Sequence, residues 1–354
     1  MAKRRISTVR TVVGILWVVL VAIVAIYVVN DRRSELTGIS SIFSHMNLGL
    51  LIPALILESA SMAAYAQLQR SMLAAGGVES GFWRILSIFL ASNTINSVVP
   101  GGPAFASVYS YRRFRDVGAS EGLSGWAVLA ANVLAGLSLF LLAVIGLLIS
   151  EGSVSGISLT GSLVTVGVVL IGILYLVARA DKAVHRVGSL LMFLERKLGA
   201  SWKFTKKVLQ LEEEISLISP SRARLTRAFV WGLLNWIFDA SVLVIAYFAT
   251  KSPIPFEGLL LAYGAGQLAA NFPITPGGLG VVEGSISIAL VAYGGNQDAS
   301  IAAVLIYRLL SFWMWLLPGI GCYFGLRMRR AENRVDDGPL IVLEEVKDEQ
   351  AGTG

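Results

Sequence analysis

Charged side chains are scarce in this sequence of 354 residues. Asp, Glu, Lys and Arg together make up 15% of it, against roughly 25% in an average soluble domain. Hydrophobic residues make up 55%, and the mean hydropathy is +0.70. A soluble fold of this size could not keep so much apolar side chain away from water. The composition therefore predicts an integral membrane protein built from helices.

Cysteine and histidine are almost absent, which removes several classes of function. Cys322 is the single cysteine, so a disulfide scaffold is excluded. Only His45 and His185 are available for a histidine-based zinc or haem site. The sequence also lacks a Walker A pattern, a G-x-S-x-G elbow and an H-E-x-x-H motif. We therefore expect no enzyme, no catalytic residue, no metal and no cofactor.

Six apolar runs are long enough to cross the hydrocarbon core of a bilayer as helices. They cover Thr11–Val29, Asn47–Leu68, Leu123–Ile149, Leu159–Ala178, Phe229–Ala249 and Ile301–Leu326. The first run follows a basic segment, residues 1–10, and is longer than the roughly 7–15 apolar residues of a signal peptide. We interpret it as a retained span. Residues 11–330 then form one membrane domain, and the acidic residues 331–354 are predicted to be a disordered tail.

The positive charge is concentrated in one loop. Residues 179–227 contain 11 Lys and Arg and 5 Asp and Glu, a net charge of +6 that equals the excess of the whole chain. Nucleic-acid binding is one reading of a basic segment, but a cytoplasmic loop facing anionic lipid headgroups explains it better. We expect both termini and this loop to be cytoplasmic, in a multi-pass protein of the plasma (inner) membrane that does not bind nucleic acid.

Two further apolar stretches are interrupted by proline and glycine. Ile85–Tyr111 is broken at Pro100-Gly101-Gly102-Pro103, and Gly258–Tyr293 is broken between Pro273 and Gly278. Such residues remove or free backbone hydrogen bonds, and each half, at about 15 residues, is short for a full crossing. Arginines flank the first stretch, whereas Glu257 and Asp298 flank the second. We predict two re-entrant hairpins that enter from opposite sides, although full spans would preserve the same parity.

The two breaks resemble each other. Asn96 precedes the first Pro-Gly-Gly and Asn271 precedes the second. Transporters with inverted repeats form their central sites from interrupted helices in corresponding positions. We therefore expect an inverted repeat whose two breaks line a polar or water-filled site, because irregular backbone at membrane depth requires one.

Charged residues inside the apolar stretches mark the candidate site, since a charge at the bilayer centre costs at least about 2.5–3.5 kcal/mol. Arg308 and Glu283 are expected to pair, either to fix helix packing or to form a headgroup site. The arginine fork suits phosphate, and the half-helix N-termini after Gly102 and Gly278 also favour an anion. Glu58 and Asp239 could instead form a cation or proton site, or be neutral acids that hydrogen bond a neighbouring helix.

The sequence thus predicts a headgroup site made of one deep arginine, its partner, two helix breaks and a basic mouth. Arg112 is either a charge that stops the first hairpin on the inside or a phosphate clamp at the cytoplasmic mouth. The candidate residues are Arg308, Glu283, Arg112, Asn96, Asn271, Gly101, Gly102, Gly277, Gly278 and Tyr307, with Glu58 and Asp239 as an ion or proton site.

The run from Asn271 through Pro276-Gly277-Gly278-Leu279-Gly280 to Glu283, with Tyr307-Arg308 downstream, resembles a known family. This is the lysylphosphatidylglycerol synthase transmembrane-region family, the flippase-like membrane part of the multiple peptide resistance factor. The resemblance covers about Arg10 to Arg330. Many members carry an acidic residue at the first break, where this chain has Gly101-Gly102. The soluble aminoacyl-transfer domain is also missing.

The resemblance implies lipid translocation without aminoacylation. The leading hypothesis is a lipid flippase or transporter that moves an anionic phospholipid or a polyprenyl-phosphate-linked lipid between leaflets. The alternative is an accessory subunit or scaffold of envelope glycolipid synthesis. Membrane lipids are the expected partners, with anionic headgroups at the basic loop. The sequence leaves the cargo, the energy source and an oligomeric state open.

Overall fold

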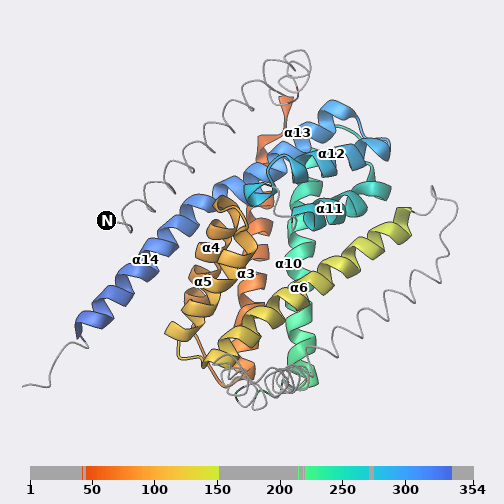
Figure 1. Cartoon of the computed structure of the whole chain (residues 1–354). Coiled ribbons are helices and arrows are strands. Elements are labelled where there is room, and N and C mark those ends of the chain that lie inside the picture. The colour runs from red at the N-terminus through yellow and green to blue at the C-terminus, as the bar shows by residue number, and fades with distance from the viewer. Residues whose placement is uncertain are drawn as a thin grey trace, which may run out of the picture.

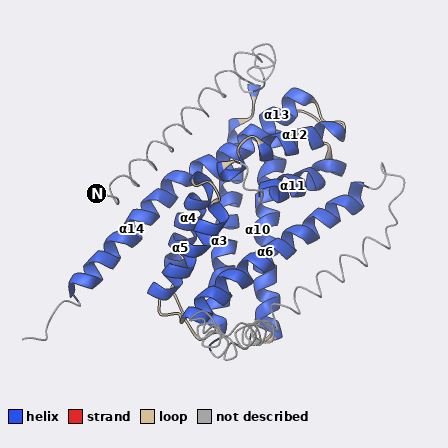
Figure 2. Ribbon diagram, viewed as in Figure 1, coloured by secondary structure: helices blue, strands red, loops and turns tan. Residues whose placement is uncertain are grey.

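The computed structural model describes residues 42, 45–150, 214, 218, 220–270 and 275–336 of the chain. Within these residues every regular element is a helix, as Figure 2 shows. The predicted spans Thr11–Val29 and Leu159–Ala178, most of the basic loop and Asn271 lie outside the described residues. The helical class predicted from composition is confirmed.

The described helices follow one another along the chain with short connections. In order they are η1 (Leu48–Leu50), α3 (Leu51–Ala75), α4 (Phe82–Val98), α5 (Gly102–Asp116), α6 (Glu121–Ser150), α10 (Arg222–Ala249), α11 (Phe256–Ala270), η2 (Pro276–Gly278), α12 (Val281–Ala292), α13 (Gln297–Arg308), the π-helix η3 (Leu309–Trp313) and α14 (Met314–Asp336).

Four helical segments are long and apolar enough to cross a membrane. They are Leu48–Ala75, Glu121–Ser150, Arg222–Ala249 and Gln297–Met328. They confirm the four predicted spans that fall within the described residues. Large apolar side chains remain exposed on their outer surfaces, such as Ile52 at 68% and Leu317 at 77%. Exposed apolar surface of this kind is what contact with lipid chains requires. The final helix continues to Asp336, past the point where the acidic tail was predicted to begin.

α3 and α10 form an antiparallel pair in the middle of the molecule (Figure 1). At one end, Arg224 Nη1 at the start of α10 donates to the carbonyl of Ala74 at the end of α3, at 3.0 Å. At the other end, the N–H of Asn47 before α3 donates to the carbonyl of Ala249 at the end of α10, at 3.1 Å. The arginine thus satisfies a helix C-terminal carbonyl that has no partner within its own helix.

α4 and α5 form a hairpin that begins at the α3 end carrying Ala75. Arg84 Nη2 near the start of α4 donates to the carbonyl of Asp116 at the end of α5, at 3.1 Å, so both ends of the hairpin lie together. At the tip, Gly101 has a φ of 69°. A Cβ on Gly102 would overlap the carbonyl of Asn96, so glycine at this position allows the two backbones to approach.

α11 and α12 form a second hairpin, which begins near the end of α10. Gly258 at the start of α11 packs directly against the ring of Tyr293, which follows α12. At its tip, Gly277 has a φ of 62°. Since α3 and α10 are antiparallel, a hairpin that follows α10 opens at the opposite end from one that follows α3. The two hairpins are therefore opposed, as predicted, and each returns to the end from which it started.

The tips of the two hairpins meet. A Cβ placed on Gly277 would lie 2.9 Å from the carbonyl oxygen of Ser97, near the end of α4, and would overlap the ring of Phe312 in η3. The π-helix between α13 and α14 thus passes the point where the breaks converge. Such π segments are rare and often lie at functional sites. This contact brings together the two irregular backbone segments that the sequence placed at membrane depth.

Candidate headgroup site

A cavity of about 470 Å³ lies where the two helix breaks meet. Its volume falls within the range of roughly 300–1,000 Å³ that small-ligand sites occupy. Eight of the candidate residues line it, and they come from both breaks and from α3, α10 and α13. These eight are Glu58, Asn96, Gly101, Gly102, Asp239, Gly277, Tyr307 and Arg308.

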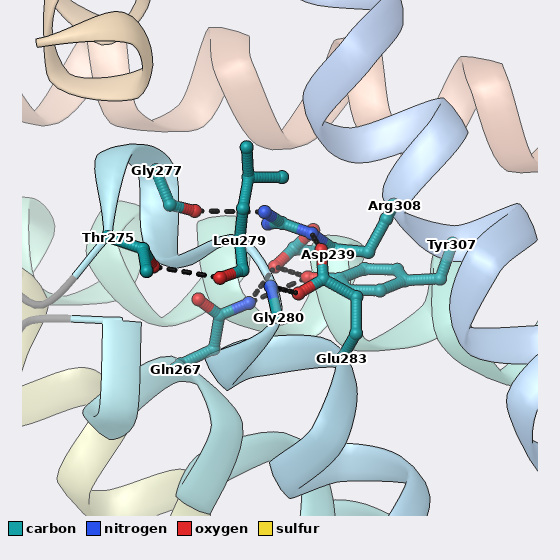
Figure 3. A network of polar contacts seen from close by, with 9 residues as sticks. All are labelled: Asp239, Gln267, Thr275, Gly277, Leu279, Gly280, Glu283, Tyr307 and Arg308. Atoms are coloured by element: carbon teal, nitrogen blue, oxygen red, sulfur yellow. Dashed lines mark hydrogen bonds and ion pairs between the residues drawn. The ribbon is translucent and has the colours of Figure 1, made fainter. Parts of the chain in front are cut away.

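Arg308 is the positively charged residue of the cavity wall among the described lining residues. Its Nε donates to Glu283 Oε1 at 2.6 Å, and its Nη2 donates to the carbonyl of Gly277 at 2.9 Å, as Figure 3 shows. Its guanidinium carbon also lies 4.2 Å from the ring centre of Phe312. The contact predicted between Arg308 and Glu283 is therefore present. Three partners hold the guanidinium at the second break, with 7% of the residue exposed.

Glu283 joins the arginine to the start of a helix. Its Oε2 accepts a hydrogen bond from the N–H of Gly280 at 2.7 Å, which caps α12 (Figure 3). Because the carboxylate lies in the first helical turn, it also interacts favourably with the partial positive charge there. Glu283 does not itself line the cavity. The half-helix N-terminus that was expected to attract an external anion is thus already satisfied by an internal one.

The N-terminus of α5 at the first break has a different environment. Gly101, Gly102 and Pro103 all line the cavity. No side chain among the described residues caps this helix. Asn93 and Asn96 of α4 line the same side of the cavity. This wall is polar and uncharged, and it presents the positive end of a helix dipole.

Asp239 is the centre of a second hydrogen-bond network. Its Oδ2 accepts from the hydroxyl of Tyr263 at 2.5 Å and from that of Tyr307 at 2.9 Å. Gln267 Nε2 lies 3.2 Å from the same oxygen and 2.6 Å from the Tyr307 hydroxyl (Figure 3). Tyr307 precedes Arg308 in α13, so the two networks are adjacent along one helix. A change at one site can therefore be transmitted to the other through consecutive residues.

The sequence matches the family described as the lysylphosphatidylglycerol synthase TM region over residues 11–319. The chain belongs to this family. The match covers both hairpins and the Arg308 site, and it confirms the resemblance drawn from the second break. It also agrees with the four candidate spans, so the protein is a multi-pass membrane protein of this family.

Similar proteins are known from archaea. One UPF0104 membrane protein of Methanothermobacter thermautotrophicus is 32% identical over 97 residues, which is 27% of this chain and 28% of that protein. The UPF0104 membrane protein PH1989 of Pyrococcus horikoshii is 23% identical over 117 residues, or 33% of this chain and 35% of that protein. The matched regions thus span about a third of the length of these relatives, and their names state only that they are membrane proteins.

The remaining candidates lie elsewhere. Gly278 is buried beside the second break without lining the cavity. Arg112 is exposed on α5 and does not line the cavity either. Its neighbour Arg113 is buried instead, with Nη1 3.0 Å from Asp116 Oδ2 and the guanidinium 5.0 Å from the ring centre of Tyr109. The proposed role of Arg112 at a mouth of the site stays a prediction.

Two residues of the site were missed in the sequence analysis. Tyr263 hydrogen bonds Asp239, and Phe312 packs on Arg308. A helical spacing could have revealed each of them. Tyr263 lies four residues before Gln267, and Phe312 lies four residues after Arg308, so both pairs share a helix face.

Proposed function

We propose that this protein moves an anionic lipid between the two leaflets of a membrane by passing its phosphate-bearing headgroup through the cavity. The cargo class is an anionic phospholipid or a polyprenyl-phosphate-linked lipid. The observation that carries the proposal is the position of Arg308, at the wall of a cavity formed by two opposed helix breaks. Membership of the family supports a lipid-handling role.

Arg308 offers the chemistry that a phosphate group needs. Its guanidinium presents five donors in a planar fork, which matches phosphate oxygens two at a time. Two of those donors now bind Glu283 and the Gly277 carbonyl. A phosphate in the cavity can replace Glu283 as the counter-ion, while Glu283 keeps its bond to the helix start through Gly280. Because one anion replaces another, the arginine never remains buried without a partner.

The outer surface of the protein suits the rest of a lipid. Exposed apolar side chains such as Ile52, Trp83 and Leu317 cover the outside of the helices. Acyl or prenyl chains can remain in the bilayer beside these surfaces while the headgroup occupies the polar cavity. This division removes the main barrier to spontaneous lipid exchange, which is the cost of moving a charge through hydrocarbon.

The setting of this activity follows from charge. We propose a plasma (inner) membrane location with both termini and the loop 179–227 on the cytoplasmic side, where the basic loop contacts anionic headgroups. The proposed transport is non-covalent and needs no metal or cofactor. Membrane lipids are its partners.

The test is lipid movement in reconstituted vesicles. The full chain is placed in liposomes that contain a fluorescent anionic phospholipid or a fluorescent zwitterionic one, and the accessible fraction in the outer leaflet is followed over time. We expect faster movement of the anionic lipid. Arg308→Lys keeps the charge but loses the two-donor fork, so it should fold and lose most of this movement.

Arg84→Lys is the matched control, because Arg84 is exposed at the base of the first hairpin and away from the cavity. It should move lipid at the wild-type rate. Equal rates for anionic and zwitterionic lipid, or full activity in Arg308→Lys, would contradict a phosphate site. Absence of movement in the wild type would instead favour an accessory or scaffold role in glycolipid synthesis.

A further inference from the structure

Two carboxyl groups line the same cavity as Arg308. Glu58 on α3 and Asp239 on α10 are 1% and 7% exposed. The two groups are close enough to hydrogen bond each other when one of them carries a proton. Neither of them forms a salt bridge with a cation among the described residues. The cavity therefore contains two adjacent acids whose charges are not neutralised by a directly bound base.

The two acids differ in their hydrogen-bond partners. Asp239 accepts hydrogen bonds from Tyr263, Tyr307 and Gln267. Glu58 Oε2, treated as a carboxylate oxygen, is buried and has no donor among the described residues. Two carboxylates in contact and away from water do not both stay ionised, so they share one proton. Asp239, with three donors, is then the carboxylate, and Glu58 carries the proton and donates to it.

We propose that Glu58 and Asp239 form a proton-binding site that couples lipid movement through the cavity to a proton gradient. This inference rests on the proposed headgroup role of Arg308. The step is reversible proton binding to a carboxyl oxygen, with no covalent chemistry. It would supply the energy source that the sequence leaves open.

The geometry favours a proton over a metal ion at this pair. The two tyrosine hydroxyls and the amide NH₂ of Gln267 direct their hydrogens at Asp239 Oδ2. A metal ion needs several oxygens with free lone pairs facing it, whereas these groups present donors. In the described part of the chain, no group of three or more acidic, histidine or cysteine side chains converges to hold a metal. A proton requires only the two carboxyl oxygens.

The titratable groups around the pair come from three elements. Tyr263 faces Asp239 from α11, and Tyr307 and Arg308 act on it from α13. Glu283 on α12 is bound by Arg308. Among the described residues, α4, α6 and η3 contribute only uncharged side chains to the cavity lining. Arg308 is thus the cation whose occupancy the pair can sense.

Coupling to the lipid follows from the adjacency of Tyr307 and Arg308. Tyr307 donates to Asp239 at 2.9 Å, while Arg308 binds Glu283 at 2.6 Å. A phosphate that engages Arg308 adds negative charge near Asp239, which favours uptake of a second proton by the acid pair. By linkage, protonation of the pair must favour phosphate binding to the same degree. Lipid and proton would therefore move together.

The first test detects the proton without measuring transport. Infrared difference spectra of the full chain in lipid vesicles, recorded as pH is stepped, report the C=O stretch of protonated carboxyl groups. We expect a band from a buried protonated carboxyl at neutral pH in the wild type. Glu58→Gln should remove this band, and it replaces the protonated acid by a neutral side chain of the same shape. Glu257→Gln, which alters an exposed acid at the start of α11, should leave the band in place.

Asp239→Asn gives a second variant if Glu58→Gln does not fold, because removing the carboxylate partner must shift the frequency of the Glu58 band. A wild-type spectrum without such a band, or a band unaffected by both variants, would overturn the proton site.

The second test applies a pH gradient across vesicles that contain the fluorescent anionic lipid. With one proton per lipid, each pH unit should change the steady-state ratio between leaflets about ten-fold. Glu58→Gln should abolish the dependence of this ratio on the gradient, whereas Glu257→Gln should preserve it. A sodium gradient at equal pH on both sides should have no effect.

The outcomes separate this inference from the proposed function. Lipid movement that ignores the pH gradient would leave the function intact and overturn proton coupling. A response to sodium instead of pH would overturn it in favour of a cation site. If no lipid moves under any condition, the proposed function fails, while the infrared band still decides whether Glu58 holds a proton.

Discussion

The two hairpins share a local design and differ in charge. Each tip contains Pro-Gly-Gly, and in both the first glycine is left-handed, with φ of 69° at Gly101 and 62° at Gly277. At the first tip α5 begins immediately at Gly102, and the cavity wall is neutral. At the second, α12 begins after Gly280 and carries Glu283, which binds Arg308. Only the second tip therefore carries an ion pair.

This difference assigns separate tasks to the hairpins. The first supplies a polar wall and a helix N-terminus without a side-chain cap, both of which tolerate an anion without binding it tightly. The second supplies a cation that already has an internal counter-ion. A phosphate entering the cavity would thus exchange with Glu283 at one wall and meet only neutral groups at the other. Weak binding at the first wall favours release, which transport requires as much as binding.

The largest expected effect comes from breaking the ion pair of the second hairpin. Glu283→Ala leaves Arg308 buried without its carboxylate, and loss of one partner of a buried pair costs about 3–5 kcal/mol. The double variant Glu283→Ala/Arg308→Ala removes both charges and should be milder than the sum of the single changes. Thermal unfolding of the purified protein in detergent measures all three.

The first hairpin offers a control for this experiment. Arg113 and Asp116 pair at its base with 3.0 Å between Nη1 and Oδ2, and the Asp116 side chain is 24% exposed. Asp116→Ala should cost less than Glu283→Ala, because water reaches this pair. Purely additive effects of Glu283→Ala and Arg308→Ala would show that the two side chains do not interact.

The Pro-Gly-Gly breaks and the ion pair were visible in the sequence for a physical reason. Proline removes a backbone donor, glycine frees the backbone, and a charge within an apolar run is costly, so each feature departs from its local background. The opposed hairpins followed from charge at their ends. Their closure into one cavity, with Gly277 beside Ser97, could not be predicted, because it depends on contacts between segments far apart in the chain.

The π-helix Leu309–Trp313 and the burial of Arg113 were not predicted. The sequence showed an uninterrupted apolar run where the structure inserts η3, since a π segment needs no proline or glycine. Adjacent arginines on a helix point in directions about 100° apart, and tertiary packing decides which one is buried. Arg113 Nη1 lies 3.5 Å from the carbonyl of Leu326 in α14, a contact that local pattern cannot reveal.

An intermediate effect is expected from the equivalent glycines of the two tips. Gly101→Ala must hold an alanine at positive φ, which costs about 1–3 kcal/mol, but its added Cβ has space. Gly277→Ala has the same backbone cost, and its Cβ also overlaps the ring of Phe312. Crowding of this kind adds about 1–3 kcal/mol.

Melting temperatures of the two alanine variants check this comparison of the glycines. We expect Gly277→Ala to melt lower and to disturb the cation–π contact of Arg308 with Phe312. Equal melting temperatures would mean that Phe312 can move aside, and the second tip would then be no more tightly packed than the first.

The smallest effect on stability is expected at Arg112, on the outer surface of the first hairpin. Arg112→Ala removes an exposed charge and should change the free energy of unfolding by less than about 0.5 kcal/mol. Arg113→Ala loses the ion pair with Asp116 and the contact with Tyr109, so it should destabilise more. If Arg112 captures phosphate at a cytoplasmic mouth, its alanine variant should still bind anionic vesicles less tightly and move lipid from the inner leaflet more slowly. Vesicle co-sedimentation and leaflet-resolved fluorescence at low and high salt test this, because contact with an exposed arginine should weaken as salt screens it. Unchanged capture in Arg112→Ala would reduce this residue to a charge that stops the hairpin on the inside.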